Sequence, residues 1–247
     1  MKRHLITAIA ALCIFGAADA GARKPMPPRH YGGYADSGVT LSVGYLHSAY
    51  KNKEWVNDEV SRDKGLNGLY AGVTKDFPIV RRTVFFQTGA VYEYQNFSNR
   101  FTNAGSTLVS DRDEHYLDIP FRLKLTMKVL PELRAFIYAG PTLDFGLSST
   151  VTYRQKVNDT VAKYTYNFYS GKVKSNTLLG YEPVVPAGAF RRFDIFMGGA
   201  LGVEIYDRAE VKIGMDWGLL NKNKKKDVAD YLITHRNLFH LGIGVRF

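Results

Sequence analysis

Hydrophobic and polar side chains alternate strictly along the last dozen residues of the chain, from Arg236 to Phe247. One parity holds the apolar side chains Phe247, Val245, Ile243, Leu241 and Phe239, and the other holds Arg246, Gly244, Gly242 and His240. Successive side chains of a β-strand point to opposite faces, so this pattern predicts a strand with one wholly apolar face. Such a strand suits a closed barrel in lipid, where the apolar face contacts acyl chains. The alternative is an edge strand of a soluble sandwich.

Seven earlier segments show the same period of two. The predicted strands are residues 39–45, 68–75, 84–94, 117–127, 135–147, 193–205 and 211–219. The fourth is the clearest, because apolar side chains from Leu117 to Met127 alternate with polar or small ones over its whole length. With the terminal strand, the count is eight.

The connections between these segments alternate in length. The links after the second, fourth and sixth strands, residues 76–83, 129–134 and 206–208, are short, whereas those after the first, third, fifth and seventh are long. An antiparallel transmembrane barrel with tight periplasmic turns and long extracellular loops has this organisation. We therefore predict an all-β fold, an eight-stranded antiparallel barrel over residues 37–247 with both termini in the periplasm.

The amino-terminal segment has the features of a secretory signal peptide. Lys2 and Arg3 precede an apolar run that is too short to span a bilayer, and the run is followed by the small-residue site Ala18-Asp19-Ala20. We expect cleavage after Ala20, with residues 1–20 removed and residues 21–36, which contain several prolines, forming a flexible periplasmic lead-in.

Composition and charge narrow the classes of function. The single cysteine, Cys13, lies within the predicted signal peptide, so we expect no disulfide, zinc-thiolate site or cysteine nucleophile in the mature chain. The formal net charge of +10 could suggest nucleic acid, but an exported chain rarely meets it. We expect outer-membrane lipid and anionic lipopolysaccharide to be the partners of this charge, and no nucleic acid.

Three phrases, YLDIPFRLKL (residues 116–125), IYAGPTLDFG (137–146) and FDIFMGGALGVEI (193–205), resemble the PorT-like or porin-like outer-membrane β-barrel family of Gram-negative bacteria. The resemblance covers residues 39–247. It implies that the carboxy-terminal alternation ending in Phe247 is the signal read by the barrel-assembly machinery during insertion. It also implies a role as an accessory component of a protein secretion machine. The phrases describe lipid-facing alternation and identify no activity.

The inward parity of the predicted strands carries charges of both signs. These candidate lumen residues are Glu93, Asp118, Arg122, Lys124, Asp144, Asp194, Glu204, Lys212 and Asp216. Eight strands enclose a space just wide enough for side chains to fill, and buried charges must pair or be hydrated. We expect a structural ion-pair network here, and a narrow proton or ion pathway is the alternative.

The longest connection, residues 148–191, is the best candidate for a functional loop. Its alternating segments flank Asn158-Asp159 and predict a hairpin that extends the strands 135–147 and 193–205 beyond the membrane. The candidate binding residues for a glycan, lipopolysaccharide or a partner protein are Tyr153, Lys163, Tyr164, Tyr166, Lys172 and Lys174. A protective, solvated loop is the alternative. The later run from Lys222 to Lys226 is expected to be a solvated tip.

No pattern predicts catalysis, a cofactor or a metal site. Some eight-stranded barrels modify lipid A with a His and a Ser acting together, but the neighbours His47 and Ser48 would point to opposite faces of a strand. We expect His240 to be an inward packing residue. The sequence therefore favours a non-enzymatic surface structural or interaction protein, followed by the secretion accessory, a narrow channel and a lipid A-modifying enzyme.

Overall fold

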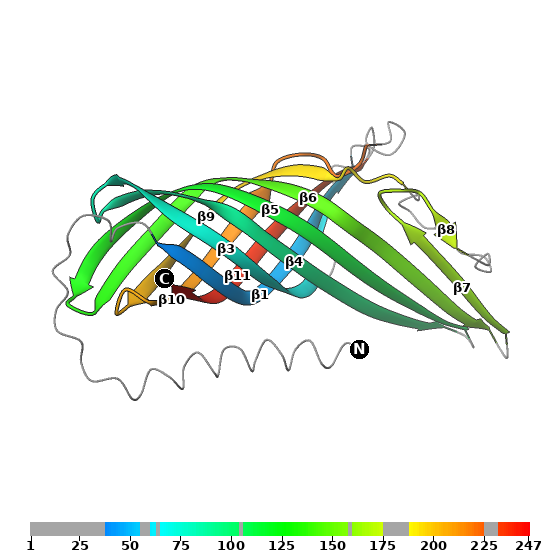
Figure 1. Ribbon diagram of the computed structural model, residues 1–247. Helices are drawn as coiled ribbons and strands as arrows, with labels where there is room; N and C mark the ends of the chain where they lie inside the picture. Colours follow the sequence, from blue (N-terminus) through cyan, green and yellow to red (C-terminus); the bar gives the residue numbers. More distant parts are fainter. Residues whose placement is uncertain are drawn as a thin grey trace, which may run out of the picture. The chain divides into compact units, whose positions relative to one another are not determined.

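Eight antiparallel strands form a closed ring in the computed structural model, which describes residues 38–54, 60–62, 65–103, 106–157, 160–174, 188–224 and 232–247 (Figure 1). The ring consists of β1 (Val39–Glu54), β3 (Leu66–Val80), β4 (Val84–Asn103), β5 (Ser106–Leu130), β6 (Leu133–Val157), β9 (Phe193–Ile205), β10 (Ala209–Gly218) and β11 (Leu232–Arg246). β1 pairs with β11, which closes the ring. The predicted eight-stranded barrel is confirmed. The predicted signal peptide and lead-in lie outside the described residues.

In the described part of the chain, three further strands lie outside the ring. β2 (Val60–Arg62) pairs with β1, β7 (Thr160–Asn167) pairs with β6, and β8 (Val173–Lys174) pairs with β7. Among the described residues, no helix is long and apolar enough to cross a membrane.

An apolar belt surrounds the ring. Its outward side chains are strongly exposed, among them Leu41, Leu69, Val73, Leu123, Leu125, Ile137, Leu201, Ile213, Leu241 and Ile243. An apolar surface of this extent would be unfavourable in water, because soluble monomers rarely expose continuous apolar patches of more than a few hundred Å². The alternation predicted from the sequence therefore produces a surface that suits lipid, and the last strand contributes Leu241, Ile243 and Val245 to it.

The two ends of the barrel differ. At one end, β3–β4, β5–β6 and β9–β10 are joined by tight turns, and both Val39 and Phe247 lie there, joined by backbone hydrogen bonds. At the other end β4, β5 and β6 continue well beyond the belt, and β7 lies beside β6 (Figure 1). We call the part formed by residues 96–103, 106–115, 148–157, 160–167 and 173–174 the outer sheet. The strands β4, β5 and β6 are thus much longer than their apolar patterns predicted.

β6 and β7 pair as the two arms of the predicted hairpin, but the hairpin extends only one of the two strands named for it. Its first arm is the continuation of β6, whereas its second arm, β7, ends at Asn167 and β9 begins only at Phe193. β7 instead pairs with the edge of β6 that β9 occupies nearer the membrane, and β5 pairs with the other edge of β6 as far as Ser106 and Val157. The strand predicted over residues 193–205 is confirmed as β9, but its predicted extension beyond the membrane was wrong, because β7 occupies the edge of β6 along which β9 would have continued.

An irregularity in β6 reverses which side chains face outward. Tyr116 pairs with Gly146 and His115 pairs with Ser148, so Leu147 is an extra residue, as in a β-bulge. Below Leu147 the even-numbered side chains, such as Asp144, face the lumen; above it Ser149 and Val151 are buried. The polar side chains at 152, 154 and 156 consequently lie on the outward face.

This reversal gives a first prediction. With cysteine placed at Thr152 or at Val151, a maleimide that cannot cross membranes should label Thr152→Cys on intact cells, and Val151→Cys should stay protected until unfolding. Cys13 lies within the predicted signal peptide, so we expect no competing thiol in the mature chain. Preferential labelling of Val151→Cys would contradict the bulge.

Candidate surface-binding site and its sealed support

The lumen below the outer sheet is filled by charged side chains in successive layers. All nine lumen residues predicted from the sequence are buried. In the layer nearest the tight turns, Lys124 Nζ lies 3.2 Å from Asp76, 2.6 Å from Glu204 and 3.5 Å from Glu210. Arg246 lies 3.1 Å from Glu204, and Lys212 lies 2.9 Å from Glu210.

The middle layer contains the inward histidine. His240 Nδ1 lies 3.4 Å from Asp216, and its Nε2 is 3.3 Å from the Tyr138 hydroxyl. Arg122 lies 3.6 Å from Asp216 and 4.6 Å from the Tyr138 ring centre. A cavity of about 30 Å³, with room for roughly one water molecule, remains between these groups. The packing position predicted for His240 is confirmed, and His47 and Ser48 point to opposite faces.

The upper layer centres on Arg236, which was not among the predicted lumen charges. Its guanidinium lies 2.7 Å from Glu93, 3.6 Å from Asp144 and 3.5 Å from the centre of the Tyr116 ring. Lys222, which was expected at a solvated tip, is buried and lies 3.1 Å from Asp144 and 3.6 Å from Asp194. That expectation was wrong, because the lumen carboxylates stabilise a buried ammonium group; residues 225–226 lie outside the described residues.

Two loop segments close the barrel above this layer. Phe190 and Asn223 form a β-bridge, with hydrogen bonds from Arg191 N to Lys222 O and from Lys224 N to Ala189 O, both 2.7 Å long. Asn223 Nδ2 also donates to Leu232 O and Thr234 Oγ1. These bonds fix the backbone that carries Lys222 into the lumen.

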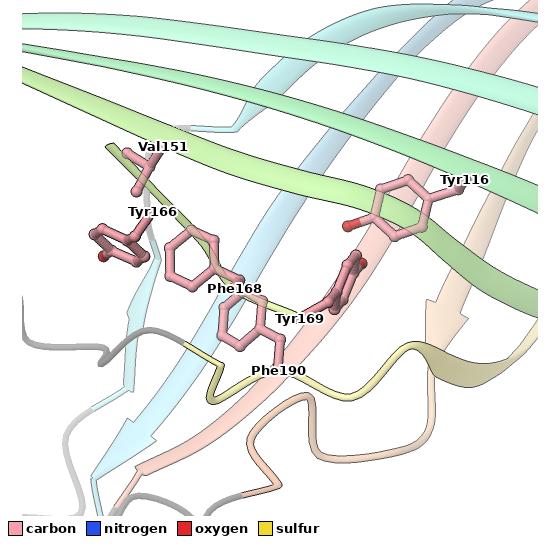
Figure 2. Close-up of a cluster of buried hydrophobic side chains, with 6 residues drawn as sticks. All are labelled: Tyr116, Val151, Tyr166, Phe168, Tyr169 and Phe190. Carbon is pink, nitrogen blue, oxygen red and sulfur yellow. The ribbon is translucent and has the colours of Figure 1, made fainter. Parts of the chain in front are cut away.

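An aromatic cluster covers the same opening and supports the base of the outer sheet. Figure 2 shows its members, Tyr116, Val151, Tyr166, Phe168, Tyr169 and Phe190, of which the rings of Phe168 and Phe190 stack at 4.5 Å. The guanidinium of Arg112 lies within 5.4 Å of the rings of Tyr50, Phe168 and Phe190. Buried aromatic contacts of this kind add to the stability gained from area burial alone.

Glu114 anchors this cluster from below. Its carboxylate lies 2.6 Å from Arg112 and accepts hydrogen bonds from Tyr50, Tyr116 and Ser149. Burial alone would raise the pKa of Glu114, but the Arg112 charge and the hydrogen bonds from Tyr50 and Ser149 outweigh it and lower the pKa to about 2. Glu114 is therefore an ionised group held in a fixed position above the apolar belt.

The six candidate binding residues do not form one surface. Tyr153 pairs with Tyr164 and Val151 with Tyr166, on the face turned toward the aromatic cluster, and Tyr166 is fully buried. Lys163 pairs with Arg154 on the opposite, exposed face. Lys174 lies opposite Thr165 and shares the face of Lys163; Lys172 is exposed beyond β7. Tyr166 was thus wrongly predicted as a surface residue, because adjacent strand residues point to opposite faces.

The chain belongs to a known family. The family model for the outer membrane protein beta-barrel domain matches residues 23–222, so the protein is an outer-membrane β-barrel, and the long-loop end with the outer sheet is extracellular. No curated protein sequence matches the chain.

Solved structures to which the chain is similar include the attachment invasion locus protein Ail of Yersinia pestis, at 11% identity and a TM-score of 0.37, covering 86% of this chain and 99% of that one. Neisserial surface protein A matches at 9% identity and a TM-score of 0.36, covering 84% and 97%. The barrel domain of Pseudomonas aeruginosa OprF matches at 10% identity and a TM-score of 0.29, covering 83% and 97%. These likenesses concern the fold alone, and the PorT-like part of the resemblance stays a prediction.

The lumen layers give a second prediction. Lys124→Met leaves three buried carboxylates without their shared cation, which should lower the free energy of unfolding by about 3 to 5 kcal/mol. Urea unfolding in detergent micelles, followed by tryptophan fluorescence, measures the loss. Lys128→Met, at an exposed position on the same strand, is the control and should change little. Equal stability of the two variants would argue against the network.

Glu114 gives a third prediction, on pH. Because its pKa is depressed in the folded state, its stabilisation is complete above the unfolded-state pKa near 4.5 and is lost as pH falls toward about 2. This depression corresponds to about 3 kcal/mol. Thermal unfolding followed by circular dichroism should show Glu114→Gln destabilised at pH 7, with its deficit shrinking between pH 4.5 and 2. Glu132→Gln, in the exposed β5–β6 turn, should match the wild type; a constant deficit would contradict the assignment.

Proposed function

We propose that this protein is a non-enzymatic surface protein of the outer membrane, whose barrel holds the outer sheet in place for contacts at the cell surface. The observation that carries the proposal is the contrast between the two parts of the molecule. The lumen is filled by ion pairs and closed by the loop segments, which favours a structural role for the barrel over transport. The outer sheet, in contrast, continues beyond the belt with an exposed polar face.

The contacts at the base of the outer sheet indicate that the barrel holds this sheet rigidly. Glu114, Arg112 and the aromatic cluster tie β1, β5, β6 and β7 to the closing loops at the point where the outer sheet leaves the barrel. A rigid surface loses less conformational entropy on binding than a flexible loop of the same length. The proposal therefore locates function on the outer sheet, and periplasmic termini follow from the same orientation.

The fourth prediction separates this proposal from the secretion-accessory reading. A photo-crosslinking amino acid at Val161, on the outward face of β7, should give adducts with surface components when intact cells are irradiated. The same amino acid at Val129, near the β5–β6 turn, is the control, and both side chains are exposed. A PorT-like accessory would instead give its principal adducts, with secretion components, from Val129. Adducts from Val129 alone would contradict the proposal.

A further inference from the structure

Basic side chains form a row across the exposed face of the outer sheet. The strand register places Arg100 of β4 beside Val109 of β5, Val109 beside Arg154 of β6, and Arg154 beside Lys163 of β7. Strands lie about 4.8 Å apart, so the row spans roughly 14 Å. Lys156 lies two residues from Arg154 on the same face, and Lys174 lies opposite Thr165.

This face has an excess of positive charge. Among the described residues it carries five basic side chains, Arg100, Arg154, Lys156, Lys163 and Lys174, and two carboxylates, Asp111 and Asp113. Both carboxylates already have partners within the sheet. Tyr94 and Asn96 donate to Asp113, and Ser98 donates to Asp111, which is also paired with Arg154.

Arg154 and Lys163 lie directly opposite each other on β6 and β7, and Asp111 offsets the charge of Arg154. Like charges at opposed positions of neighbouring strands have Cβ atoms about 5 Å apart and destabilise the pairing. Neither side chain packs into the aromatic cluster, since both are exposed. Clustered cations of this kind are favourable when an anion lies between them, which is a binding role.

The orientation of the exposed face of the outer sheet indicates which anion lies beside it. Below the bulge at Leu147, outward side chains of β5 and β6, such as Leu123 and Ile137, face the acyl chains of the membrane. The row lies on the continuation of the same side of the barrel wall, above the belt. The molecules whose acyl chains contact this wall have their phosphorylated sugars directly above, beside the outer sheet.

We infer that the row of Arg100, Arg154 and Lys163, with Lys156 and Lys174, binds phosphate groups on the sugars of lipopolysaccharide in the surrounding outer leaflet. The inference rests on the proposed function, because it names the partner of the outer sheet. Arg100 and Lys163 provide the ends of the row, and Arg154, balanced by Asp111, lies between them. The tyrosines of the hairpin belong to the other face and support the sheet.

The test compares Arg100→Gln/Lys163→Gln with the wild type by titrating each folded, detergent-solubilised protein with purified lipopolysaccharide and with the same lipopolysaccharide after chemical removal of its phosphates. Removing two exposed ion pairs with phosphate should weaken the affinity of the double variant for lipopolysaccharide about tenfold at low salt. We expect this loss of affinity when the double variant binds intact lipopolysaccharide, and an equal loss when the wild type binds dephosphorylated lipopolysaccharide. Arg81→Gln/Lys128→Gln, at exposed positions near the tight turns, is the matched control and should bind like the wild type.

Unchanged affinity in the double variant, or equal binding of the two lipopolysaccharides by the wild type, would overturn the inference. Heparin, a soluble sulfated polysaccharide, serves as a further probe. If the double variant lost affinity for heparin but not for lipopolysaccharide, the row would bind a different anion, and the inference would again be overturned. Heat-modifiable migration on a gel verifies that each variant is folded. A failure here, together with Val161 adducts on cells, would leave the proposed surface role intact.

Discussion

The closure of eight strands into a narrow ring is the constraint on which the rest of the structure depends. Pairing of β1 with β11 removes every edge within the lipid, where an unpaired backbone group would cost several kcal/mol. The same closure leaves a space that only side chains can fill. The charges on the inward parity must therefore neutralise one another at close range, as Lys124 and Arg236 do with their carboxylates.

This filled interior turns the barrel into a support. The ion-pair layers extend to the extracellular opening, where Lys222 enters from a loop and Arg112 and Glu114 continue the pattern beneath the aromatic cluster. The outer sheet begins at this reinforced level. Its two faces have separate roles, since the inward aromatic face fixes the sheet to the barrel and the outward face is left for contacts.

The sequence predicts the barrel well, because a period of two reports directly which face each side chain occupies. The nine lumen charges predicted from it are all buried, although Asp76, Glu210 and Arg236 were not among them. Lys222 was not predicted either, because it lies in a loop segment where alternation carries no information, and the outer parts of β5 and β6 lack the apolar face that marks a strand in lipid. The bulge at Leu147 has no sequence signature. Alternation alone could, however, have separated Lys163 from its neighbour Tyr164.

Ring closure is tested most directly by amide hydrogen exchange of the protein in lipid nanodiscs, resolved along β1 and β11. With the ring closed, amides of residues 40–46 and 240–245 should exchange as slowly as those of the adjoining strands β3 and β10 at the same depth. If the amides along one side of both β1 and β11 exchanged as fast as those of an unpaired sheet edge, the closed barrel would be contradicted. The support that the filled barrel gives to the outer sheet would then also be contradicted.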